Sequence, residues 1–296
     1  MQWERAKTYL IIFFIILNIG LFGLILFEER RYTMTQEQER TIRAVLAANN
    51  INVYTTLRRF PPMQPLEVSG FYYDIEQLLA IFFENPEQVP RDPFGDERPD
   101  DMLHYIFVHN NKRLEISNGF ISFYNPYGME NPNNPALSND NGTLNRDVAR
   151  SMTNAFIQTY FRNFVEDQVF EIGSELRISY RQEYRGRIVQ SNFIEFSISN
   201  TGITHIDMRF GRVMGHSGTT RMLYAPDEVL LTFMQRVSAI AVDTPFFISH
   251  MDLVYYQEYT SNLPDTSSLA FPFYRIFIQG NDMPFMINAF YNTILD

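Results

Sequence analysis

Cysteine is absent from the 296 residues of this chain. Its absence excludes disulfide bridges, zinc-thiolate sites, thiol catalysis and lipid attachment to an N-terminal cysteine. Lysine is nearly absent too, with only Lys7 and Lys112, which argues against a catalytic lysine. Basic charge is scarce overall, because 24 Lys and Arg stand against 34 Asp and Glu, and the net charge is −10. Such a chain lacks the basic surface that nucleic-acid binding requires.

Apolar and aromatic residues, in contrast, are plentiful. Hydrophobic residues make up 45% of the chain, and 27 Phe and 17 Tyr are present. A chain of this length and composition can bury two modest cores. Large aromatic side chains pack well on the pleated surface of a sheet, so we expect a β-containing fold.

Residues 9–27 form an uncharged, apolar run of 19 residues. As a helix this run spans roughly 28 Å, the thickness of one bilayer crossing. A cleaved signal peptide has a shorter apolar region and a site of small residues after it, whereas Glu28 and Glu29 follow here. The pattern predicts a signal anchor, with residues 1–8 in the cytoplasm and the rest outside. Basic residues flank both ends of the run, so charge alone does not fix this orientation.

Two faces of the predicted anchor carry residues that favour helix contacts. Gly20 and Gly23 lie about 60° apart on a helix, and Asn18 lies roughly opposite them. Small residues allow a second helix to approach closely, and an amide can form a hydrogen bond across a helix interface. The sequence therefore predicts contacts to partner helices through Asn18, Gly20 and Gly23, although glycine is also simply common in membrane helices.

Residues 28–130 contain the patterns of helices and strands together. Thr35 and Gln38 fit a capping box, and Asp74 precedes a second apolar helical pattern. The dipeptide Asn118-Gly119 is typical of a hairpin turn. The expected strands are residues 53–57, 103–108, 113–117 and 120–124.

Residues 131–143 lie in a stretch rich in Pro and Asn, which predicts a linker before a second part at 144–296. In this second part Thr143 is the expected N-cap of a helix, and Asp227 begins another. Strands of alternating pattern are expected near residues 176–180, 194–198, 206–210, 252–259, 273–278 and 285–290. The predicted fold class is α+β, with two α+β parts and antiparallel sheets outside the anchor.

No catalytic pattern in the sequence is complete. Gly215 to Gly218 resembles a nucleophile elbow, but Thr219 stands where that motif requires glycine. His104 and His109 are expected on opposite faces of one strand, so they are not placed to bind one metal ion together. We therefore expect no catalytic residues, no metal site and no cofactor.

An acidic loop is the remaining candidate for a binding function. Residues 91–101 combine Pro with one aromatic ring and several carboxylates. A solvated loop explains this composition, and a partner-docking loop is the functional alternative. The candidate docking residues are Asp92, Phe94, Asp96, Glu97, Asp100 and Asp101.

Both ends of the chain resemble the YycI family. The start, with Trp3 and Lys7 directly before the anchor, is similar to that family's M-x-W-x-x-x-K opening. The segment from Pro272 through Arg275 to Ile276, followed by Gly280 and the run Ile287-Asn288-Ala289, is similar to its closing hairpin. Tyr274 replaces the usual Trp of that hairpin.

The resemblance implies a regulatory membrane protein of Gram-positive bacteria. Members of the family work with the similar protein YycH and control WalK, the sensor histidine kinase of cell-wall metabolism, and the family supplies no catalytic residues. The function implied is therefore non-enzymatic regulation through transmembrane and extracytoplasmic contacts. The alternative is a membrane-anchored extracytoplasmic domain that binds a ligand or hydrolyses cell-wall material.

Overall fold

The computed structural model describes the following residues: 7, 11–21, 34–70, 74–90, 104–117, 119–129, 137, 144–209, 211–238, 245–257, 267–281 and 283–295. Residues 11–21, within the predicted anchor, are helical, and the rest of residues 9–27 lies outside the described residues. Within the described parts of the chain, no helix combines the length and apolar composition needed to cross a membrane.

The chain is an α+β protein with a large, mixed, mostly antiparallel sheet, and its contacts divide it into two units. Unit 1 comprises Met1–Met63, Arg221–Met251 and Ile276–Asp296. Unit 2 comprises Gln64–Thr220 and Asp252–Arg275. This division differs from the expected one, because the described residues on both sides of 131–143 belong to unit 2. The reason is the pairing of β5, which precedes this segment, with β9, which follows it.

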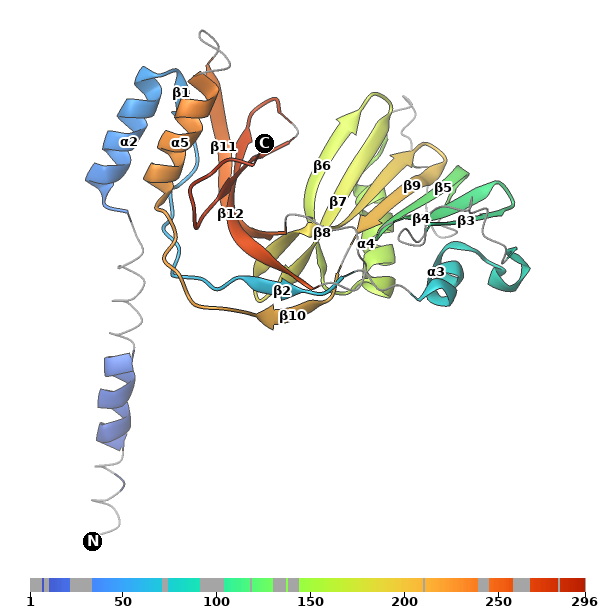
Figure 1. The fold of residues 1–296 in the computed structure, drawn as a ribbon, viewed down its shortest axis with the longest axis horizontal. Coiled ribbons are helices and arrows are strands. Elements are labelled where there is room, and N and C mark those ends of the chain that lie inside the picture. Colours follow the sequence, from blue (N-terminus) through green and yellow to red (C-terminus); the bar gives the residue numbers. More distant parts are fainter. Residues whose placement is uncertain are drawn as a thin grey trace. The chain divides into compact units, whose positions relative to one another are not determined.

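Unit 1 is built on two helices that lie side by side, α2 (Gln36–Ala48) and α5 (Pro226–Ser238) (Figure 1). The predicted capping box of α2 is confirmed: the Thr35 hydroxyl accepts from the Gln38 N–H, and the Gln38 side chain accepts from the Thr35 N–H. The strand β1 (Ile51–Val53) runs parallel to the start of β11 (Phe246–Tyr256), and β13 (Phe285–Asn288) pairs with β12 (Ser268–Ile278).

Unit 2 contains most of the strands. They are β2 (Leu66–Val68), β3 (His104–His109), β4 (Lys112–Ser117), β5 (Phe120–Met129), β6 (Phe164–Ile172), β7 (Glu175–Tyr184), β8 (Arg187–Ser199), β9 (Gly202–Arg209) and β10 (Val213–His216). Its helices are α3 (Ile75–Phe82), η1 (Pro86–Gln88) and α4 (Arg146–Tyr160).

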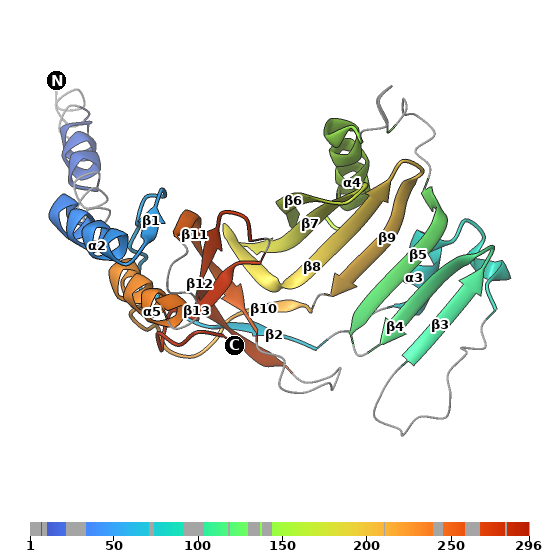
Figure 2. The same ribbon diagram turned by 90° about the horizontal axis from the view of Figure 1, so that it is seen from above.

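In the described part of unit 2, helices cover one face only of the main sheet. Its strand order is β6-β7-β8-β9-β5-β4-β3, with every neighbouring pair antiparallel (Figure 2). Alternate side chains of these strands pack with α3 and α4 into one apolar core, in which Phe82, Phe156 and Phe196 are buried. Because side chains alternate across a strand, the other face carries the polar residues.

Three features depart from the expectations. Asn145, not Thr143, caps α4: its side chain accepts from the N–H groups of Asp147 and Val148. The helix ends at Tyr160, and Phe164 begins β6, a strand that is not among those expected from the sequence. The sheet is also not purely antiparallel, since β11 runs parallel to both β1 and β8.

The cap of α4 gives a test of the observed helix boundary. Asn145→Ala should lower the free energy of unfolding by about 1 kcal/mol, because two N–H groups of the first turn lose their acceptor. Urea unfolding followed by circular dichroism measures the change. Thr143→Ala is the matched control and should have little effect; a larger loss from Thr143→Ala than from Asn145→Ala would contradict the assignment.

Candidate functional site

The predicted contact residues are only partly described. In the helical residues 11–21, the Asn18 amide donates to the Phe14 carbonyl of its own helix at 2.8 Å. A Cβ added to Gly20 meets no atom within 4 Å, so this position is open to a close neighbour. Gly23 lies outside the described residues, as does the whole predicted docking loop with Asp92, Phe94, Asp96, Glu97, Asp100 and Asp101.

The histidines do not gather at one place in the described residues. His104 and His109 lie on opposite faces of β3, as predicted: His104 approaches Glu115 of the polar face, whereas His109 lies edge-on to Phe83 of the core. His216 contacts the rings of Tyr184 and Tyr255. Among the residues described, no group of three or more acidic or histidine side chains is placed to hold a metal ion.

The helix-free face of the sheet, which we call the open face, is the main polar surface of unit 2. Strand register places its side chains in rows that cross β4, β5, β9, β8 and β7. One row begins with Arg113, Tyr124 and His205. The three rows are Arg113-Tyr124-His205-Ser197-Arg177, Glu115-Ser122-Asp207-Glu195-Ser179 and Ser117-Phe120-Arg209-Phe193-Arg181.

The carboxylates of these three rows each lie beside a basic side chain. Asp207 and Glu195 stand directly opposite each other, an arrangement that is destabilising for like charges unless each is compensated. The Arg181 guanidinium lies 2.9 Å from Glu195, and the His205 ring lies 2.9 Å from Asp207. Arg113 likewise lies 2.7 Å from Glu115. The rows are therefore held together by ion pairs between neighbouring strands and along them.

Exposed aromatic rings lie among these pairs. Tyr124 is 47% exposed and Phe120 is 36% exposed, although both belong to a regular central strand. A hollow of about 260 Å³ lies beside Tyr124, lined also by Arg113, Glu115, Ser122 and His205. Aromatic and arginine side chains of this kind are enriched where proteins bind other proteins.

Ser122, His205 and Asp207 bring together the three side-chain types of a hydrolytic triad. Both the Ser122 hydroxyl, at 3.1 Å, and the Asp207 carboxylate, at 2.9 Å, contact the same atom, His205 Nε2. A triad needs the carboxylate on one ring nitrogen and the hydroxyl on the other, so that the second nitrogen can accept the hydroxyl proton. This geometry instead forms a cross-strand hydrogen-bond cluster.

The open face ends at β6 and β7 in a buried ionic cluster around Arg275. The Arg275 guanidinium donates to Asp252 at 2.6 and 2.9 Å, to Asp167 at 2.9 Å and to Gln190 at 2.7 Å. Its side chain is 3% exposed and that of Asp167 is 4% exposed. Arg181 extends the cluster, with Nε 3.7 Å from Asp167. One arginine thus links strands β6, β8, β11 and β12.

Irregularities in two strands place the polar groups of this cluster. The register of β6 against β7 shifts between Glu166 and Gln168, which leaves Asp167 as the extra residue of a bulge. The register of β7 against β8 shifts after Arg181, across the segment of β8 that contains Gln190. A bulge turns a side chain away from its regular direction, and both bulges turn one toward Arg275.

The sequence reasoning missed this cluster. Arg275 was noticed only as part of a family motif, and its partners Asp167, Gln190 and Asp252 were not singled out. The available signal was the single charge of Arg275 within the apolar run Phe271–Ile278, since a charge buried in a strand requires a partner.

The environment shifts the pKa of two groups described above. The hydrogen bond that the His205 ring donates to the Asp207 carboxylate raises the pKa of His205 above its ordinary value, against the opposing effect of burial. Burial lowers the pKa of Arg275, but the hydrogen bonds and charges of Asp252 and Asp167 outweigh it, and the net shift is upward. Both groups therefore favour their charged forms beside carboxylates.

Comparison with known proteins gives likenesses of structure. No protein-family profile and no curated protein matches the sequence. An uncharacterized protein from Eubacterium rectale ATCC 33656 matches with a TM-score of 0.49 and 9% identity, over 84% of this chain and 91% of that one. The Bacillus megaterium YpeB C-terminal domain matches with a TM-score of 0.42 and 8% identity, over 77% of this chain and 97% of that domain. YycH from Bacillus subtilis matches with a TM-score of 0.45 and 12% identity, over 77% of this chain and 54% of YycH.

Breaking the buried cluster should be costly. Arg275→Met leaves the Asp167 carboxylate buried without its closest cation, and we expect a loss of about 3 to 5 kcal/mol in the free energy of unfolding. Arg113→Met, which removes an arginine whose side chain is 51% exposed, should cost about 0 to 1 kcal/mol. Replacing Asp167 and Asp252 by Asn together with Arg275→Met should restore much of the loss. Equal effects of the two arginine substitutions would contradict the role of the cluster.

The His205 pair gives a pH-dependent contribution to stability. Because its pKa is raised in the folded state, the stabilisation is complete below the ordinary pKa of 6.5 and is lost as pH rises through the folded-state pKa. Asp207→Asn should move the pKa of His205 down, whereas Ser122→Ala should leave it raised. NMR titration of the imidazole measures both, and an unchanged pKa in Asp207→Asn would refute the assignment.

Proposed function

We propose that this protein is a non-enzymatic, membrane-anchored regulator of a WalK-like sensor histidine kinase, which acts together with a YycH-like partner. Residues 1–8 are cytoplasmic in this proposal, residues 9–27 cross the membrane, and residues 28–296 lie outside the cell. The controlled process is cell-wall metabolism. Regulation proceeds by contact, through the anchor and through the folded units.

The observation that carries the proposal is the chemistry of the open face. Glu115, Glu195 and Asp207 each lie beside a basic side chain. His205 contacts both the Ser122 hydroxyl and the Asp207 carboxylate through the same ring nitrogen. The rings of Phe120 and Tyr124 are among its exposed groups. A surface of paired charges and exposed rings binds by contact.

The sequence resemblance to the YycI family supports the identity of the partners. Its C-terminal residues have clear structural roles: Arg275 centres the buried cluster, Gly280 takes a positive φ of 82° in the turn after β12, and the Asn288 side chain accepts from the N–H groups of Phe290 and Tyr291. The residues that carry the resemblance are therefore needed to form this fold.

The alternative of an anchored ligand-binding domain is favoured by one observation, a cavity of about 500 Å³ in unit 2. One protein can have both functions, if it regulates by contact and also binds a ligand. The two functions are separable by experiment, because substitutions in the anchor test the first and substitutions in the cavity test the second.

The anchor provides the test of regulation. Gly20→Leu combined with Gly23→Leu should weaken association with one partner helix, because the larger side chains prevent its close approach. Asn18→Leu should weaken the other about threefold to thirtyfold through loss of an interhelical hydrogen bond. Since one N–H of the Asn18 amide already donates to Phe14, the second N–H and the side-chain oxygen are left for that bond.

Association in membranes should be measured separately for the kinase and for the YycH-like protein, at equal expression and insertion. Ile19→Leu is the matched control within the same turn. Should both associations survive all the substitutions, or should an unrelated apolar anchor regulate the kinase equally well, the helix would be only a tether.

A further inference from the structure

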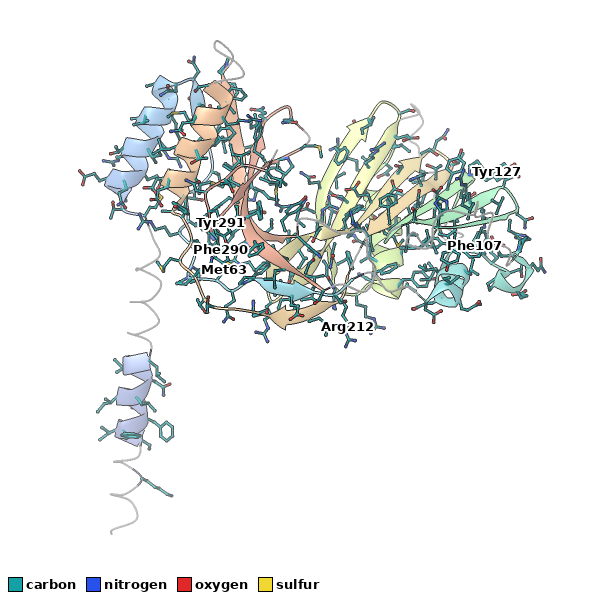
Figure 3. The ribbon with its side chains drawn as sticks, viewed as in Figure 1. Met63, Phe107, Tyr127, Arg212, Phe290 and Tyr291 are labelled. Carbon is teal, nitrogen blue, oxygen red and sulfur yellow. The ribbon has the colours of Figure 1, made fainter. Side chains whose placement is uncertain are left out.

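A cavity of about 500 Å³ opens at the far end of β5, where this strand meets the C-terminal ends of α3 and α4 and the start of β4. Figure 3 shows Tyr127 at this end of the sheet and Phe107 on the side that faces α3. The volume falls within the range of small-molecule sites, about 300 to 1,000 Å³. All its lining residues belong to unit 2.

The inner wall of the cavity is apolar and its mouth is aromatic. Phe82 and Phe83, at the end of α3, are buried in the core and line the cavity together with Met129. Tyr127 is 65% exposed and Tyr160 is 44% exposed, so two rings stand at the opening. This arrangement can cover the apolar body of a ligand while leaving one end accessible to water.

Asn125 fixes the shape of the wall before any ligand binds. It is buried, and its side chain donates to the Gly128 carbonyl at 2.8 Å and accepts from the Tyr127 N–H at 3.2 Å. Gly128 has a φ of 75°, and an added Cβ would lie 2.2 Å from the Thr201 carbonyl oxygen. The Tyr127 hydroxyl in turn accepts from Asn111 at 2.9 Å. A site held in this way loses little entropy when a ligand enters.

The basic group among the lining residues of the cavity is Lys112, one of the two lysines of the chain. Its ammonium donates to the Glu84 carboxylate at 2.9 Å. The Lys112 side chain is 21% exposed and that of Glu84 is 83% exposed. Such an exposed carboxylate contributes little to stability, so another carboxylate can take its place on Lys112.

We propose that this cavity binds a small amphiphilic carboxylate, whose apolar body packs against Phe82, Phe83 and Met129 and whose carboxylate replaces Glu84 on Lys112. The site is independent of the regulatory contacts proposed above. Every ligand of this class has an anionic group at one end and an aromatic or aliphatic body of modest size at the other.

Naphthalene-1-acetate and its neutral amide, naphthalene-1-acetamide, form a matched pair of probes. The full chain in lipid nanodiscs is dialysed to equilibrium against each probe, with empty nanodiscs as the blank. The acid should bind about tenfold more tightly than the amide, because only the acid forms a charge-assisted hydrogen bond to Lys112.

Variants then locate the binding. Lys112→Gln should weaken the acid about tenfold and leave the amide unchanged, whereas Glu84→Gln should tighten the acid by removing its competitor. Arg113→Gln removes the same charge from the next residue, on the opposite face of β4, and should have no effect. Ala80→Trp, at an exposed position that lines the cavity, should block both probes.

Circular dichroism of each variant confirms that the fold is retained. Equal binding of acid and amide overturns the proposal, as does acid binding that is unaffected by Lys112→Gln or by Ala80→Trp. Failure of the acid to bind at all overturns it too.

Discussion

The interaction on which unit 2 depends most is the burial of Arg275 among carboxylates. A guanidinium removed from water costs several kcal/mol of solvation, which is recovered only if every donor finds an acceptor in good geometry. Asp252, Asp167 and Gln190 supply these acceptors from three other strands. The cluster therefore helps to specify which strands meet, because a missing partner would leave a buried charge uncompensated.

The same requirement explains the asymmetry of the sheet. One face is covered by α3 and α4 and is uniformly apolar, whereas the open face carries rows of charges that are compensated only in the native register. A shift of β9 by one residue would turn His205 and Asp207 into the core. Ion pairs on the open face and the apolar core on the other face thus specify the same strand register.

Local features of this fold could be predicted from the sequence, and long-range ones could not. The capping box at Thr35, the hairpin strands around residues 104–124 and the meander β7-β8-β9 depend on neighbouring residues and follow the predicted pattern. The division into units depends on pairings such as β1 with β11, which join residues nearly 200 positions apart. The ionic cluster stayed hidden because bulges, which leave no periodic signal, aim Asp167 at Arg275. The sequence contains only one signal of the cavity, which is the isolated Lys112.

The order of segments in the two units has a consequence for how the chain folds during synthesis. Unit 2 is interrupted by part of unit 1 and is complete only with Asp252–Arg275, and unit 1 needs the last segment, Ile276–Asp296. Neither unit can close while the C-terminal fifth of the chain is still on the ribosome. Such non-local closure is slow, and until it occurs β2 lacks its partner β12 and β8 lacks its partner β11. A truncation that removes only the final residues should therefore impair folding far more than its size suggests.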